Sequence, residues 1–246
     1  SGSIGKWLPF RASVGYYNQS GLVRKDNVER WTGNVVLSPS FLDDHLKLTI
    51  NAKGTLNNNT FYNDAAVWAA ATFNPTIPVY SGNSSYRGYT EAIDAAGLPA
   101  NSAVKNPRGL VDLYDSQSKV RRFIGSMDVD YKVHFLPELK LHATLGADYA
   151  KGDGTVYVPA EAASAFNKDA SLSGNDYKYG PQKNENRLLT LYANYAKYFE
   201  NIKSNVDLTA GYDYQYWKSS TPEYFTKSAA GTVLSTVKAS NYRHVL

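Results

Sequence analysis

Polar and apolar residues alternate strictly in the stretch KLHATLGADY, residues 140–149. Every second residue is polar or small, and the residues between them are apolar. Because successive side chains of a strand point to opposite faces, this pattern predicts a β-strand with one polar face in contact with water and one apolar, dry face. The dry face meets either a protein core or lipid, and these two environments belong to very different proteins.

The same alternation recurs elsewhere, with uneven strength. It predicts an all-β chain of about seven antiparallel strands. The further strands are expected at residues 10–18, 29–38, 45–54, 122–135, 187–198 and 205–216.

The connections between these strands alternate between short and long. Outer-membrane barrels place short turns at the periplasmic end and longer loops at the extracellular end, whereas soluble sandwiches mix the two more freely. The order therefore favours a transmembrane β-barrel segment. The short turns are expected at 38–44, 135–139 and 199–204, and the long loops at 19–27, 55–118, 151–184 and 219–240.

Aromatic residues are abundant, with 20 Tyr, 9 Phe and 4 Trp in 246 residues. On the dry faces they gather near strand ends, as Trp31 and Tyr131 do, while the strand centres are aliphatic, as at Leu48 and Leu145. Two aromatic girdles around an aliphatic band are typical of a lipid-facing surface. The polar faces are then expected to line a lumen, with the residues Lys47, Asp128, Asp130, His142 and Asp148.

The long loops are expected to carry short helices. Residues 62–75 read as one helix, capped by Asn63 or Asp64; residues 90–97 read as a second and residues 161–167 as a third. The longest loop also holds aromatics that either contact a substrate or partner protein or form the core that folds the loop. These candidates are Trp68, Tyr80, Tyr86 and Tyr89.

Nothing in the composition or motifs indicates an enzyme. The net charge of +4 comes without a basic run, which disfavours nucleic-acid binding, and the absence of Cys excludes thiolate chemistry. Asp128 and Asp130 have the spacing of a glycosidase pair, but alternate charges on any wet strand face look the same. No catalytic residue, metal site or cofactor is therefore predicted.

Three stretches carry a resemblance to a known family. They are LPFRASVGYYNQSGLVRKDNVERWTGNVVLSPSFLDDHLKLTINAKG (8–54), NPTIPVY (74–80) and NPRGLVDLYDSQSKVRRFIGSMDVDYKVHFLPELKLHATLGADYAKGDGTVYVPAEAA (106–163). The chain resembles the barrel of SusC/RagA-type TonB-dependent transporters of Bacteroidetes outer membranes. The similarity follows the order of the chain over most of residues 1–200 and rests on distributed barrel and loop patterns.

The resemblance implies an internal piece of a 22-stranded barrel. Such transporters hold a plug in the barrel, import glycans or oligopeptides with energy from the TonB complex, and work with a SusD-like surface lipoprotein. Residues 1–246 are expected to form a partial barrel domain in the outer-membrane lipid, without plug, signal peptide or barrel closure. The final ASNYRHVL is expected to begin another strand.

Two other readings stay open. Alternation alone does not separate lipid from a protein core, so a soluble β-rich carbohydrate-binding or adhesion module is the main alternative. A small passive barrel is the other, although an odd strand count argues against it. The sequence does not give the identity of a substrate.

Overall fold

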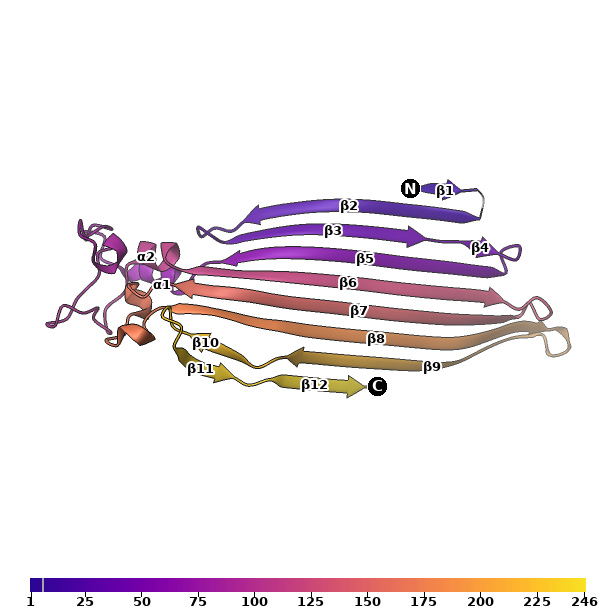
Figure 1. Ribbon diagram of the computed structural model, residues 1–246. Coiled ribbons are helices and arrows are strands. Elements are labelled where there is room, and N and C mark those ends of the chain that lie inside the picture. Colours follow the sequence, from indigo (N-terminus) through magenta and orange to yellow (C-terminus); the bar gives the residue numbers. More distant parts are fainter. Residues whose placement is uncertain (6) are drawn as a thin grey trace.

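One antiparallel sheet carries nearly all the strands of the computed structural model, which describes residues 1–5 and 7–246 (Figure 1). The strand order is β1-β2-β3-β5-β6-β7-β8-β9-β12, with β4 paired to β5. The strands are β1 (Gly2–Ile4), β2 (Leu8–Ser20), β3 (Asn27–Leu37), β4 (Ser40–Phe41), β5 (Leu46–Phe61), β6 (Asp115–Lys132), β7 (Leu139–Val158), β8 (Asn175–Phe199), β9 (Ser204–Thr221) and β12 (Ser240–Val245).

All seven predicted strands are present as the long strands β2, β3, β5, β6, β7, β8 and β9. The expected strand at the C-terminal residues is present as β12. The three predicted short turns join neighbouring strands at one end of the sheet, at the right in Figure 1, and the longer loops gather at the other end. This arrangement is the one that the order of the connections predicts.

The strands continue well into the segments predicted as long loops. β7 and β8 pair as far as Val158 and Asn175, and the other long strands lengthen in the same direction. Polar residues and glycines occupy most positions on both faces of these extensions, so the alternation that marks a strand in sequence is weak there. The connections that remain are residues 21–26, 62–114, 159–174 and 222–239, the last of which contains the hairpin β10 (Tyr224–Lys227) and β11 (Val233–Val237).

The first of the three predicted helices is confirmed as α1 (Ala65–Thr72), with Asp64 at its N-cap position. The second is wrong: in residues 90–97 the Asp94 carboxylate accepts the backbone N–H groups of Ala96 and Leu98 and closes a turn. The third is only the 3₁₀ turn η2 (Ala163–Ala165). The remaining helical turns are α2 (Pro107–Asp112), which the sequence reading missed, and η1 (Ser85–Gly88), η3 (Ala170–Leu172) and η4 (Glu200–Ile202).

No helix among the described residues is both long and apolar enough to cross a membrane.

The sheet is a single layer over most of its length (Figure 1). Large apolar side chains such as Val14 and Leu208 are exposed on it. The buried apolar cluster lies instead in the loops, where α1 packs against α2. A sheet with an uncovered apolar face is incomplete in water, because a soluble sheet buries that face against another layer. The cluster consists of Ala66, Ala69, Leu110 and Val111, with Val23 and Val104 packed against it.

Candidate functional site: two sheet faces and a loop surface

The apolar face is continuous across the sheet. Residues that pair directly across antiparallel strands share a face, so the register shows which side chains lie in one row. One row crosses seven strands without a polar residue. It runs through Phe10, Leu37, Ile50, Met127, Leu145, Leu189 and Tyr214.

The apolar band has the length of a membrane crossing. On β7 it runs from Leu139 to Tyr149, which is 11 of the 20 residues of the strand. A tilted transmembrane strand needs about 9–11 residues, and at about 3.3 Å per residue such a band stands roughly 25 Å tall once tilted. The rest of β7 extends beyond the band on the loop side only.

The band also shifts along the strands in the way that a barrel requires. The row of directly paired residues that contains Tyr16 of β2 ends at Ser220 of β9. The last apolar residue on the apolar face of β9 is Tyr216, which lies four residues closer to the turn end of the sheet. The row of directly paired residues that contains Phe10 of β2 ends at Tyr214 of β9. On β9 the apolar band continues from Tyr214 toward the turn end for six more residues, to Leu208.

The shift of four to six residues accumulates over six strand spacings, so it is about one residue per strand. A closed barrel of about eight strands with a shear of about eight has the same ratio, and its strands tilt by about 36°. Membrane barrels tilt by about 35–45°. A level apolar band on tilted strands therefore accounts for the drift.

The predicted polar residues all lie on the opposite face of the sheet. Lys47 pairs with Asp130, which pairs with His142. The His142 Nδ1 lies 2.6 Å from an Asp130 carboxylate oxygen, and its Nε2 lies 2.9 Å from the Thr144 hydroxyl. That hydroxyl donates to Asp128 at 2.7 Å. The face is thus a connected polar surface, and none of these groups is left against the apolar side.

Asp148, the fifth predicted residue, belongs to the same polar face. Two guanidinium nitrogens of Arg122 donate to its two carboxylate oxygens, the Nε at 2.9 Å. Bidentate pairing fixes the two side chains relative to each other. The structure therefore brings four of the predicted residues together near the turn end and places Asp148 higher on the same face.

The four predicted loop aromatics separate into two groups. Trp68 and Tyr80 are open to solvent, with 64% and 58% of their surface exposed. Tyr89 is only 8% exposed, and its hydroxyl donates to Asp112 at 2.9 Å. Tyr86 donates to the Gly97 carbonyl at 2.9 Å and packs edge-on against Phe166. Tyr86 and Tyr89 therefore hold the loop together. Trp68 and Tyr80 are mostly exposed, although the Tyr80 ring also packs against Tyr89, with ring centroids 5.4 Å apart.

The sequence reading missed Asn106, which organises the largest loop. It is fully buried, and its side-chain NH₂ donates to the carbonyls of Val79 and Thr90 at 2.8 and 3.1 Å. Its Oδ1 accepts the backbone N–H groups of Arg108 and Gly109 at the start of α2. The signal was present as Asn106-Pro107, a cap residue followed by proline at the first helical position.

Charged groups of the loops are balanced locally. Burial raises the pKa of the Glu91 carboxyl, although the Asn106 backbone N–H donates to it. Burial also pushes up the pKa of Asp112, but hydrogen bonds from Arg108 and Tyr89 outweigh it and leave that pKa below its usual value. These contacts hold α2 in place.

Other contacts tie separate loops into one surface. The Lys25 ammonium, from the β2–β3 loop, donates to the carbonyls of Asp112 and Tyr114 at 2.7 and 2.9 Å. Arg87 forms an ion pair with Glu161 of the β7–β8 loop at 3.1 Å. The loop end of the sheet is therefore one packed unit.

Comparison with known proteins gives a consistent result, although no family model matches the chain. The TonB-dependent receptor SusC of Bacteroides thetaiotaomicron is 34% identical over 227 residues, covering 86% of this chain. The chain spans only 22% of the length of that relative.

Solved structures share the fold. The RagAB peptide importer in its closed-closed state aligns over 98% of this chain and 27% of its own, with a TM-score of 0.65 and 14% identity. The ferric-catecholate import receptor Fiu of E. coli K12 aligns over 96% of this chain and 30% of its own, with a TM-score of 0.51 and 14% identity. The sheet therefore has the fold of part of the barrel wall in such receptors.

Proposed function

Since the chain is a homologue of part of the TonB-dependent receptor SusC, we propose that it forms a section of the barrel wall of an outer-membrane active transporter. The observation that carries this proposal is the continuous apolar band of membrane height on one face of a single-layer sheet. The polar face, with its linked Asp and His side chains, then lines the lumen. The full barrel has 22 strands in this proposal.

A soluble carbohydrate-binding or adhesion module fits these observations less well. Such a module covers its apolar face with a second sheet, and the described strands lie in one sheet and one small hairpin. Exposed apolar surface on the scale of this face is not kept in water by a monomer.

The transported material is a glycan or an oligopeptide in this proposal. It is captured between the barrel loops and a SusD-like surface lipoprotein, and it passes inward when the TonB complex moves a plug. The structurally similar RagAB is a peptide importer. The wall proposed here contributes a rigid polar surface to the lumen and does no covalent chemistry.

Trp68 and Tyr80 are the proposed contacts with the substrate or the lipoprotein. Both rings are exposed on a loop that Asn106 and Tyr89 hold rigid. A rigid exposed aromatic ring loses little conformational entropy on binding and buries a large area, as interface anchors do.

Uptake by living cells tests the proposal. Cells that carry the full-length gene are compared with deletion cells, each given labelled oligosaccharides or oligopeptides with and without a protonophore. We expect uptake of one class, lost on deletion and lost on de-energisation, and co-purification of the protein with an acylated lipoprotein. Uptake that continues without energy would indicate a passive pore and contradict active transport.

The double substitution Trp68→Ala/Tyr80→Ala tests the two contacts. Interface anchors each contribute more than about 1 kcal/mol, so we expect at least roughly 20-fold weaker binding of substrate or lipoprotein. Val67→Ala, an exposed neighbour on α1, is the matched control. Unchanged binding in the double variant would rule out the loop contacts without affecting the barrel assignment.

A further inference from the structure

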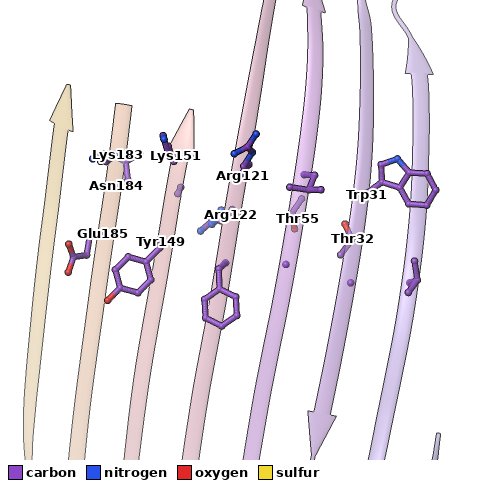
Figure 2. Close-up of a pocket in the computed structure, with 16 residues that line it drawn as sticks. Trp31, Thr32, Thr55, Arg121, Arg122, Tyr149, Lys151, Lys183, Asn184 and Glu185 are labelled. Atoms are coloured by element: carbon purple, nitrogen blue, oxygen red, sulfur yellow. The ribbon is translucent and has the colours of Figure 1, made fainter. Parts of the chain in front are cut away.

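Three basic side chains lie side by side at the loop-side edge of the apolar face (Figure 2). Arg121 on β6 pairs directly with Lys151 on β7, which pairs with Lys183 on β8. Neighbouring strands lie about 4.8 Å apart, so three like charges fall within roughly 10 Å. Like charges directly opposite each other destabilise a sheet, and an anion bound between them would remove that repulsion.

No ion pair neutralises this row within residues 1–5 and 7–246, and all three side chains are exposed. Other charges at the same edge are matched. Glu185 forms an ion pair with Arg187 and faces Lys218 across the strands. The basic row is therefore distinct from its surroundings.

An apolar hollow adjoins the basic row. Gly33 and Gly54 pair directly across β3 and β5, and a Cβ atom on either would meet nothing within 4 Å. The bare backbone lies between larger outward side chains, including Trp31 and Phe123, in one hollow of about 660 Å³. The same hollow extends along the sheet to the three basic residues, as Figure 2 shows. The three basic side chains and the apolar surface at Gly33 and Gly54 therefore belong to one site.

We propose that this hollow binds a membrane lipid whose headgroup carries more than one phosphate. The phosphates lie on Arg121, Lys151 and Lys183, and an acyl chain lies over Gly33 and Gly54. The position of Arg121 and Lys151 fits, because each lies two residues beyond the last residue of the apolar band on its strand, Phe123 or Tyr149, at the level of lipid headgroups. Lys183 lies further toward the loops on β8. This inference rests on the proposed function, since it requires the apolar face to meet lipid.

The test uses the purified full-length protein in detergent, titrated with diphosphoryl lipid A, phosphatidylcholine or inorganic phosphate, with bound molecules counted by native mass spectrometry. The first variant is Arg121→Gln/Lys151→Gln/Lys183→Gln. Its matched control, Lys53→Gln/Lys132→Gln/Lys140→Gln, removes the same charge from the polar face. A second variant, Gly54→Leu, fills the hollow without changing any charge.

Each basic residue near an anionic lipid contributes about fivefold in affinity, so we expect the first variant to bind lipid A on the order of 100-fold more weakly. The control keeps its affinity, and Gly54→Leu weakens lipid A alone. Equal lipid A affinity in the first variant and its control would overturn the proposal, as would phosphate binding as strong as lipid A binding. Should the first variant fail to fold, Gly54→Leu decides the outcome.

Insertion of the unmodified protein into phosphatidylcholine vesicles distinguishes failure of the lipid site from failure of the barrel-wall proposal. If the protein inserts but shows no preference for lipid A, the lipid-site proposal is contradicted and the barrel-wall proposal stands. If the protein does not insert, the barrel-wall proposal itself is contradicted.

Discussion

At the scale of single residues, the loops depend on a few buried polar groups. Asn106 satisfies two carbonyls and two backbone N–H groups with one side chain, and it has no exposed surface. Buried polar groups left without partners are expensive. The order of the longest loop, and with it the placement of Trp68 and Tyr80, therefore rests on this residue.

Asn106→Ala should loosen the loop without affecting the barrel. Four backbone partners lose their hydrogen bonds, and each group left unsatisfied and buried costs about 1–3 kcal/mol before relaxation and hydration. We expect faster hydrogen exchange, by at least about tenfold, in residues 79–113, with exchange in β6 to β8 unchanged. Asn101→Ala, at an exposed turn position, is the control. Protection equal to that of the control would show that the loop is held by other contacts.

Sequence reasoning identified the loop aromatics but not their roles. Tyr89 and Tyr80 are equally aromatic in the sequence, and the packing of Tyr89 over Gly109 and its hydrogen bond to Asp112 separate them in the structure. A Cβ at Gly109 would lie 3.2 Å from the Tyr89 ring. Such contacts join residues twenty positions apart, and no local pattern encodes them.

At the scale of elements, alternation predicted the seven long strands because each has one apolar face within the band. It failed on the loop side of the band, where β7 and β8 continue with mostly polar residues and glycines and the alternation is weak. The expected helix at 90–97 failed for a different reason. Asp94 closes a turn with its own side chain, and this local competition is known to displace helix formation.

β8 offers a sharp comparison of the two faces at neighbouring positions. Leu191 lies within the apolar band and Thr190 on the polar face. A lysine facing lipid near the bilayer midplane costs about 2–4 kcal/mol, so Leu191→Lys should lower the unfolding free energy of the full-length protein by about that amount. Denaturant titration in vesicles measures it.

Thr190→Lys is the matched control for that comparison, because its side chain points to the wet face and should change stability by less than about 1 kcal/mol. Equal destabilisation by the two lysines would mean that the faces do not differ in polarity of environment.

At the scale of the whole molecule, one property organises the rest. The apolar residues drift by about one residue per strand across the sheet, as they do when tilted strands carry a level apolar band, and the proposed barrel wall in lipid requires this drift. This drift is invisible in any single strand and appears only when the register is known.

The central claim is that the two faces of the sheet meet lipid and water. Single cysteines in the full-length protein in its native membrane test it directly, since residues 1–246 contain no Cys. Cysteines at Leu48 and Leu145 should react only with a lipid-soluble reagent, and cysteines at Lys47 and Thr144 with a water-soluble maleimide. Labelling of the Leu48 and Leu145 positions by the water-soluble reagent, with the other two protected, would contradict the account.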